Sequence, residues 1–307
     1  MANTAAAKAA VSEALASAPD DATARLAAVI SGSERLEALL QGVFEGSPYL
    51  WGTIAGDPAM LLRLLEEEPE AATQRILTEY ARAALDAESD ADAQVALRAM
   101  KREGALLIAL ADIGGVWSLD EVTDALTRLA DKAVRTAVDR LLLAAAKAGK
   151  IKLPNVENPG EGSGYIVLAM GKHGAGELNY SSDIDLIVFF ERDAPLAEGV
   201  EPVQFFVGIT KNLLKLVNER TADGYVFRTD LRLRPDPGST QIAISTAAGY
   251  DYYEREGQTW ERAAYIKARP VAGDLVAGEK FLKNISPFVW RRYLDHAAIA
   301  EVHAKIG

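Results

Sequence analysis

Residues 182–190 of this chain read Ser-Asp-Ile-Asp-Leu-Ile-Val-Phe-Phe. The apolar run from Leu186 onwards is typical of a fully buried strand. Asp183 and Asp185 precede this run, and residues two apart on a strand point to the same side of the sheet. We therefore expect two neighbouring carboxylates at the exposed end of a core strand, which is half of a metal site. The alternative for such a pair alone is a solvated strand end.

A second segment, residues 225–233, is expected to form a strand that carries a third acid. Its alternation gives one face to four polar side chains, Arg228, Asp230, Arg232 and Arg234. If the two strands are neighbours, three carboxylates lie close enough to repel one another, which implies a hard divalent cation, Mg²⁺ or alternatively Mn²⁺. Arg232 and Arg234 would then bind phosphate oxygens, or they would form salt bridges to the same aspartates.

A glycine-rich turn lies between an expected strand at 165–170 and the aspartates. Residues 171–179 read Gly-Lys-His-Gly-Ala-Gly-Glu-Leu-Asn. Glycines allow the backbone to approach a phosphate, and the N–H groups at a helix start favour anions. We interpret Lys172 as the charge that faces the phosphate, the alternative being an exposed lysine in a tight turn. The motif is neither Walker A nor the dinucleotide fingerprint.

Two further cations follow a later segment, residues 260–270, which we expect to be helical up to Pro270. Lys267 and Arg269 fall at its end, where the negative end of the helix dipole favours cations. They either cap this helix or contribute to a nucleotide- and phosphate-binding site. We include both of them among the candidate site residues.

The first half of the chain is expected to be helical throughout. Apolar residues recur at helical spacing over residues 22–150, and Ser118 with Glu121 has the form of a capping box. A stretch rich in Pro, Gly and Asn at 154–164 ends this pattern. We therefore predict a helical domain at 1–153 and a second domain at 154–307, whose last residues form a helix that is cut short.

Composition excludes several classes of protein. The net charge of −11 argues against a protein that lives on nucleic acid, because such proteins neutralise phosphates with Lys and Arg. The chain has no cysteine, so there is no disulfide framework and no thiolate zinc site, and it fits a cytoplasmic location. We expect no signal peptide and no membrane span, because no run of about 18 apolar residues exists.

The glycine turn, the Asp-x-Asp pair and the later aspartate together resemble the nucleotidyltransferase fold of the DNA polymerase beta superfamily. Within it, longer motifs resemble the bifunctional glutamine synthetase adenylyltransferase/deadenylase family. These motifs are Asn179-Tyr180-Ser181-Ser182-Asp183-Ile184-Asp185, Asp230-Leu231-Arg232-Leu233-Arg234, Trp260-Glu261-Arg262 and Ile266-Lys267-Ala268-Arg269. The resemblance implies an α+β fold, with an all-helical N-terminal region before a nucleotidyltransferase domain that has a mixed sheet.

That family carries two nucleotidyltransferase copies, of which the N-terminal one removes AMP from a tyrosine of glutamine synthetase and the C-terminal one adds it. The motifs at 179–185, 266–269 and 287–293 look like the removing half. The resemblance therefore implies phosphorolysis, in which orthophosphate attacks the AMP-tyrosine bond and gives ADP and unmodified enzyme. Two alternatives stay open: adenylyl transfer from ATP, or a fragment that binds nucleotide or a partner without catalysis.

The resemblance also implies roles for individual residues. The metal ligands are Asp183, Asp185 and Asp230, the catalytic arginines are Arg232 and Arg234, and the nucleotide- or phosphate-binding residues are Gly171, Lys172, Ser182, Lys267 and Arg269. The implied partners are adenylylated glutamine synthetase, orthophosphate, ADP or ATP, and a PII-type signal protein. The sequence departs from the family at His173 and Ala175, where Leu and Gly are often found.

Overall fold

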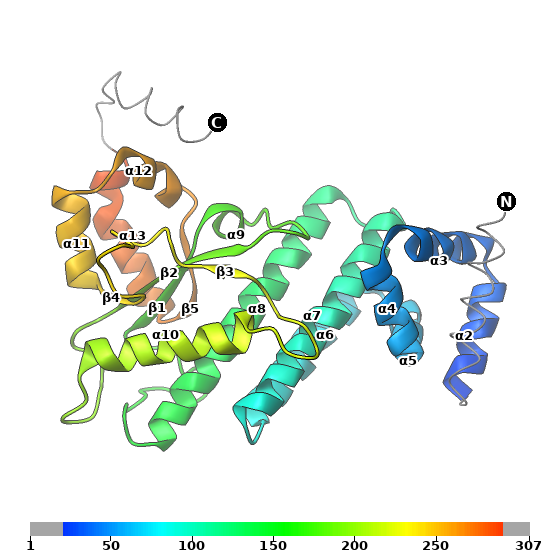
Figure 1. Cartoon of the computed structure of the whole chain (residues 1–307), viewed down its shortest axis with the longest axis horizontal. Coiled ribbons are helices and arrows are strands. Elements are labelled where there is room, and N and C mark those ends of the chain that lie inside the picture. Colours follow the sequence, from blue (N-terminus) through cyan, green and yellow to red (C-terminus); the bar gives the residue numbers. More distant parts are fainter. Residues whose placement is uncertain (1–20, 291–307) are drawn as a thin grey trace. The chain divides into compact units, whose positions relative to one another are not determined.

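A computed structural model describes residues 21–290 of the chain (Figure 1). This part contains 12 helices and 5 strands, and the helices precede a mixed sheet. The predicted α+β class is therefore confirmed. The helix expected at the C-terminal end of the sequence lies outside the described residues.

Residues 22–150 are helical, as their periodicity predicts. The helices are α2 (Asp21–Ser31), α3 (Glu34–Gly46), α4 (Pro48–Gly56), α5 (Pro58–Glu66), α6 (Pro69–Asp86), α7 (Asp90–Ile113) and α8 (Leu119–Lys147). Local chemistry fixes several of their starts: Ser47 and Asp57 each accept a hydrogen bond from a backbone N–H three residues on. The predicted capping box is also present, because Glu121 accepts from the N–H of Ser118 at 2.7 Å.

The described residues form two compact units. One unit comprises residues 21–79 and Met100–Ala125, and the other comprises Tyr80–Ala99 and residues 126–290. The limits of the units fall inside helices α6, α7 and α8. The change from helices to sheet near residue 154 is a different boundary, and a domain limit at that position stays a prediction.

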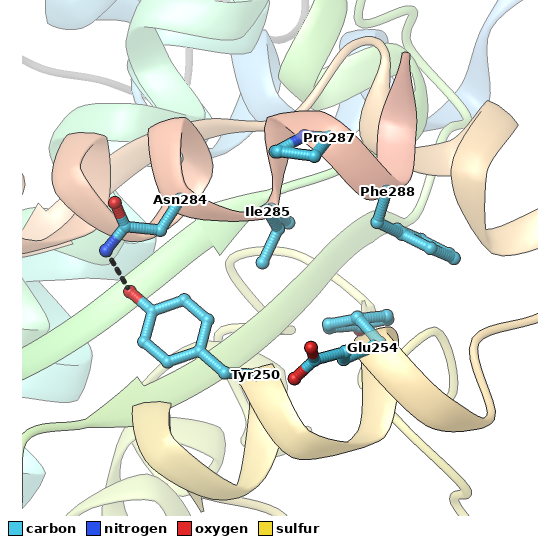
Figure 2. A pocket seen from close by; sticks show the side chains of 7 residues that line it. Tyr250, Glu254, Asn284, Ile285, Pro287 and Phe288 are labelled. Carbon is cyan, nitrogen blue, oxygen red and sulfur yellow. Dashed lines mark hydrogen bonds between the residues drawn. The ribbon is translucent and has the colours of Figure 1, made fainter. Parts of the chain in front are cut away.

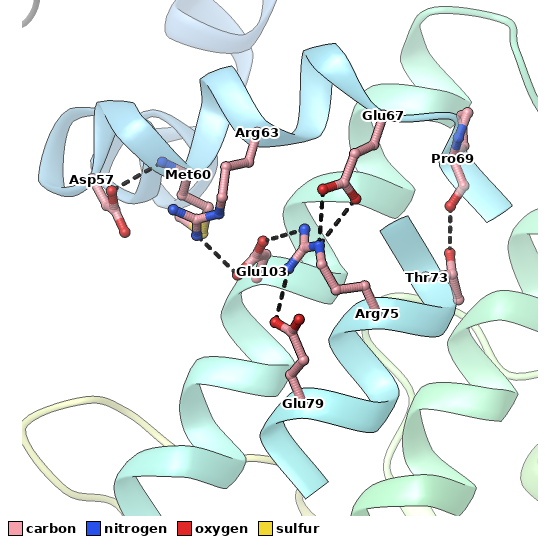
Figure 3. Close-up of polar contacts among 9 residues, drawn as sticks. All are labelled: Asp57, Met60, Arg63, Glu67, Pro69, Thr73, Arg75, Glu79 and Glu103. Carbon is pink, nitrogen blue, oxygen red and sulfur yellow. Dashed lines mark hydrogen bonds and ion pairs between the residues drawn. The ribbon is translucent and has the colours of Figure 1, made fainter. Parts of the chain in front are cut away.

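The first unit contains a buried carboxylate, that of Glu103, whose exposed fraction is 0%. Arg75 donates to it at 2.9 Å and also pairs with Glu67 at 3.0 Å (Figure 3). Arg63 reaches the other oxygen of Glu103 at 3.3 Å. A buried charge must be paired and hydrogen-bonded, so this cluster satisfies Glu103 from two directions.

Replacing Arg75 with methionine should destabilise the first unit. The change leaves Glu103 buried with a reduced set of donors, and breaking a buried pair costs about 3 kcal/mol at the lower end of the usual range. Arg82→Met is the matched control, because Arg82 is 84% exposed and, among residues 21–290, its ion pair is with Asp86 of its own helix. Urea denaturation of both variants measures the difference, and equal unfolding free energies would contradict the prediction.

The second unit is built on a mixed sheet. Its strands are β1 (Tyr165–Ala169), β2 (Ile184–Phe190), β3 (Thr229–Asp230), β4 (Ile244–Ser245) and β5 (Arg269–Gly273). The strand order is β3-β2-β1-β5; β1 is antiparallel to β2 and β5, whereas β3 and β4 pair parallel with β2. The remaining helices are α9 (Gly171–Ala175), α10 (Pro202–Asn218), α11 (Thr246–Arg255), α12 (Thr259–Tyr265) and α13 (Leu275–Val289).

Helices cover both faces of β1 and β2, which explains why the two strands are apolar along their length. Ile166 and Phe189 belong to a core cluster with residues of α11, α12 and α13. On the other face, the rings of Tyr165 and Phe190 stack on Phe206 of α10 at 5.7 and 5.0 Å between centroids. Every residue of β1 and β2 is buried except Asp185, which is half-buried near the start of β2.

The strand expected at 225–233 is much shorter than predicted. Only Thr229–Asp230 forms β3, because a side chain interrupts the ladder directly after it. The Asp230 carboxylate accepts a hydrogen bond from the backbone N–H of Arg232 at 2.8 Å. This local turn bends the chain out of the sheet. The prediction that Arg228, Asp230, Arg232 and Arg234 share one face of a strand is therefore wrong.

The helix expected up to Pro270 is also shorter. It ends at Tyr265, and Arg269 and Pro270 already belong to β5. A residue before proline prefers extended backbone, and proline is tolerated at an irregularity of an edge strand. The ladder between β1 and β5 shifts register between Val167 and Leu168, and Leu168 pairs with Pro270.

The backbone before β3 is held by a buried arginine that the sequence analysis did not identify. Arg98 is 2% exposed. Its guanidinium donates to the carbonyl oxygens of Gly224 at 2.9 Å and Leu216 at 3.1 Å, and also to that of Glu219. One side chain thus holds the backbone at the end of α10 and in the following turn. These hydrogen bonds help to position the segment that leads to Asp230.

Candidate functional site

The site is built around the parallel pairing of β2 with β3. The register sets Ile184 beside Thr229 and Asp185 beside Asp230. The expectation that Asp230 stands beside the Asp-x-Asp pair is therefore confirmed for the backbone. Residues opposite each other in neighbouring strands have adjacent side chains. Two carboxylates thus meet at the start of β2.

The electrostatics agree with this proximity. Partial burial raises the pKa of the Asp185 carboxyl, and the negative charges of Asp230 and Asp183 raise it further. Asp185 forms no hydrogen bond or ion pair with another side chain of the described residues. The nearby charge of Arg232 offsets only part of this effect, because the pKa of Asp185 stays raised, and a cation beside the carboxylate would be favoured.

Arginines neutralise the other two acids. Arg228 donates to the Asp183 carboxylate at 2.5 Å and to the carbonyl of Ser181 at 2.8 Å. Arg232 folds back on Asp230 with an Nε to Oδ2 distance of 2.8 Å, and these hydrogen bonds hold the pKa of Asp230 below its usual value. Arg228 therefore belongs to the site, although it was not among the candidate site residues predicted from the sequence.

The three carboxylates do not form a ready metal cage. Within residues 21–290, no three His, Cys, Asp or Glu side chains are arranged to hold a metal ion as they stand. The cause is visible at two of them, because arginines occupy the Asp183 and Asp230 oxygens. The donor chemistry still fits a hard cation, since all three groups are carboxylates, two of them on neighbouring strands and Asp183 directly before β2.

The glycine turn comes close to Asp185. Gly171 opens the short helix α9 with a φ of +54°, and a Cβ added there would lie 2.8 Å from Oδ2 of Asp185. A side chain at this position would therefore meet both backbone strain and the carboxylate. Lys172 is exposed, and Ser182 donates from its hydroxyl to Asn179 at 2.7 Å. The start of the glycine turn thus lies beside the Asp185 carboxylate, while a phosphate-binding role for Gly171, Lys172 and Ser182 stays a prediction.

Three of the predicted site cations form ion pairs or hydrogen bonds with groups other than the three aspartates. Arg269 makes a two-pronged ion pair with Asp131 at 2.8 and 2.9 Å. Lys267 pairs with Glu177 at 2.8 Å. Arg234 donates to the carbonyls of Leu231 at 3.0 Å and Pro237 at 2.8 Å, which closes the loop after β3. Lys267 and Arg269 are therefore paired away from the three aspartates, whereas the charge of Arg234 still helps to lower the pKa of Asp230.

Asp131 was missed by sequence analysis because nothing in its helix marks it. It lies on α8, about 40 residues before the turn, and accepts from His173 at 2.7 Å. Burial acts to raise the pKa of this carboxyl, but hydrogen bonds from His173 and Arg269 hold the pKa below its usual value. An aspartate on an amphipathic helix gives no sequence signal for such a role.

A pocket of about 560 Å³ lies between α11 and α13 (Figure 2). Its lining residues are Tyr250, Tyr253, Glu254, Asn284, Ile285, Pro287 and Phe288. Asn284 donates to the hydroxyl of Tyr250 at 3.1 Å across the pocket wall. None of the three aspartates lines this pocket, so it is separate from the acidic site.

A family model described as glutamate-ammonia ligase adenylyltransferase matches residues 37–284. The chain belongs to this family. It is 56% identical over 282 residues to the bifunctional glutamine synthetase adenylyltransferase/adenylyl-removing enzyme of Xanthobacter autotrophicus, covering 92% of this chain and 28% of the relative. The enzymes of the same name from Rhodopseudomonas palustris strain TIE-1 and Bradyrhizobium diazoefficiens are 54% and 55% identical, over 93% and 88% of this chain.

The chain spans 28% or 29% of the length of these curated relatives. The family resemblance read from the motifs is confirmed by the match. Among the described helices of this adenylyltransferase family member, none is long and apolar enough to cross a membrane.

The charge at Asp185 predicts a stability difference in this family member. Asp185→Asn should raise the free energy of unfolding at neutral pH by about 1 kcal/mol, the usual size of a favourable charge change. The reason is that the pKa of Asp185 is higher in the folded chain than in the unfolded one, so the charged form destabilises the fold. The gain should disappear as the pH falls and the native carboxyl takes up a proton.

Urea denaturation over a range of pH measures this effect. Asp193→Asn is the matched control, because Asp193 is an exposed acid in the loop after β2. If Asp185→Asn is no more stable than the wild type at neutral pH, the charge of Asp185 does not destabilise the fold and the prediction is wrong.

Proposed function

We propose that this chain removes AMP from an adenylylated tyrosine of glutamine synthetase by phosphorolysis. The observation that carries the proposal is the register that sets Asp185 beside Asp230, with Gly171 next to the Asp185 carboxylate. The names of the relatives, which are both adenylyltransferases and adenylyl-removing enzymes, support the reaction class. The motifs at 179–185 and 266–269 favour the removing half.

The proposed chemistry is a displacement at phosphorus. An oxygen of orthophosphate forms a bond to the phosphorus of AMP, and the bond from that phosphorus to the tyrosine oxygen breaks. The tyrosine oxygen takes up a proton, and the products are ADP and free tyrosine. Such transfers depend on positioning and charge stabilisation rather than on a covalent intermediate.

The chain's own residues supply both requirements in this proposal. Gly171 and Lys172, with Ser182, line the phosphate position beside Asp185. Arg232 and Arg228 donate hydrogen bonds to Asp230 and Asp183, and their planar guanidinium groups also suit phosphate oxygens. A phosphate group would compete with the carboxylates for these donors, so substrate binding and release of the aspartates are linked.

We propose Asp183, Asp185 and Asp230 as the residues that would hold Mg²⁺, with Mn²⁺ as an alternative. The ion would neutralise phosphoryl charge and would oppose the burial and the repulsion that together raise the pKa of Asp185. For this to occur, the arginines on Asp183 and Asp230 must exchange their partner. The proposed partners are adenylylated glutamine synthetase, orthophosphate, ADP or ATP and a PII-type signal protein, and the proposed location is the cytoplasm.

Phosphorolysis predicts a specific product. Adenylylated glutamine synthetase incubated with the chain, Mg²⁺ and labelled orthophosphate should yield labelled ADP. Asp185→Asn should lower the rate by about a hundredfold or more, because it removes a charge that acts at the reacting phosphate. Asp193→Asn should leave the rate unchanged, since it removes an exposed acid outside the site.

The same assay separates the alternatives. Label that passes from α-labelled ATP into glutamine synthetase, with no labelled ADP from orthophosphate, would replace removal by adenylyl transfer. A chain that binds nucleotide or glutamine synthetase and shows neither reaction would be a binding fragment. Either result would overturn the proposed activity.

A further inference from the structure

Helix α8 is attached to the glycine turn at two points. Thr127 accepts a hydrogen bond from the backbone N–H of Leu178 at 3.3 Å, and Asp131 lies 2.7 Å from Nε2 of His173. Thr127 and Asp131 are four residues apart on one helix and therefore share a face. One face of α8 thus holds both the beginning and the end of the segment 171–178.

The Asp131 contact is the stronger of the two. Its carboxylate takes both guanidinium prongs of Arg269 in addition to the imidazole of His173, which is 1% exposed. Arg269 then donates to the carbonyls of His173 at 3.1 Å and Gly174 at 3.2 Å. A charged, two-pronged pair of this kind has fixed geometry. Asp131 therefore restrains both a side chain and the backbone of α9.

The turn has no room to move without these contacts changing. A Cβ added at Gly174 would lie 2.2 Å from the carbonyl oxygen of Lys267 and 2.6 Å from that of Ala169. The helix α9 therefore packs backbone to backbone against the end of β1 and the segment just before β5. At its other end, a Cβ added at Gly171 would lie 2.8 Å from the Asp185 carboxylate.

We infer that Asp131 is a positioning residue, which fixes the glycine turn beside Asp185 through His173 and Arg269. Thr127 assists by holding the end of the turn. The proposed role explains why Arg269, a cation at the end of the candidate motif, points to a helix carboxylate rather than to the aspartates. It rests on the proposed function, because the turn is taken to bind the attacking phosphate.

Asp131→Ala should raise the KM for orthophosphate at least about tenfold, while the KM for adenylylated glutamine synthetase stays close to the wild-type value. A displacement of about 1 Å at a binding loop is enough for losses of this size or larger. Asp131→Asn keeps the shape and one acceptor oxygen, so its KM should lie between the two. A purely structural role would lower the amount of active enzyme and leave the KM for orthophosphate unchanged.

Hydrogen exchange supplies a measurement that does not depend on turnover. In Asp131→Ala and Thr127→Val, amide exchange in 171–178 should become faster, whereas Asp193→Asn should show wild-type exchange. If Asp131→Ala does not fold, Asp131→Asn and Thr127→Val decide the question by the same measurements. Exchange in 171–178 that stays at the wild-type rate in the folded variants would overturn the positioning role.

The failure of this role and the failure of the proposed function are distinguishable. If the wild-type chain forms no ADP from orthophosphate, the proposed function is wrong. Amide exchange in 171–178 and the affinity for ADP with Mg²⁺ can still be compared between the wild type and the Asp131 variants to test the positioning role. An active wild type with an unchanged KM for orthophosphate in Asp131→Ala ends the positioning role alone.

Discussion

The pairing of β2 with β3 is the constraint on which the candidate site depends. A strand covered on both faces cannot shift along its neighbours without moving large apolar side chains out of the core. Phe189 and Phe190 hold β2 in place from opposite faces. Because β2 is fixed, a β3 of only two residues is enough to set Asp230 beside Asp185.

The same geometry creates a charge problem that the chain meets with arginines. Like charges at the start of β2 repel, and two of the three aspartates are paired with Arg228 and Arg232. Both arginines are more than half exposed, so the pairs are weak and exchangeable in water. An arrangement of this kind keeps the acids near one another and allows phosphate or a cation to take over the charge balance.

Other arginines of this chain act on the backbone instead. Arg98 binds three carbonyl groups before β3, Arg234 closes the loop after it, and Arg269 joins the glycine turn to α8. Each places planar donors where irregular chain leaves carbonyl oxygens or a carboxylate to satisfy. Arg98 of α7 and Arg269 of β5 therefore hold irregular segments from regular elements, whereas Arg234 holds the loop to which it belongs.

Sequence alone determined the helical first part, the two core strands, the glycine turn and the presence of acids at the start of β2. Those features follow from local periodicity and from residue types that act over a few positions. Tertiary structure decided that β3 pairs with β2 so that Asp230 lies beside Asp185, and it decided the partners of Arg269 and Lys267. A charged side chain binds whichever opposite group folding brings near, and Asp131 is 138 residues from Arg269 along the chain, beyond what any local pattern encodes.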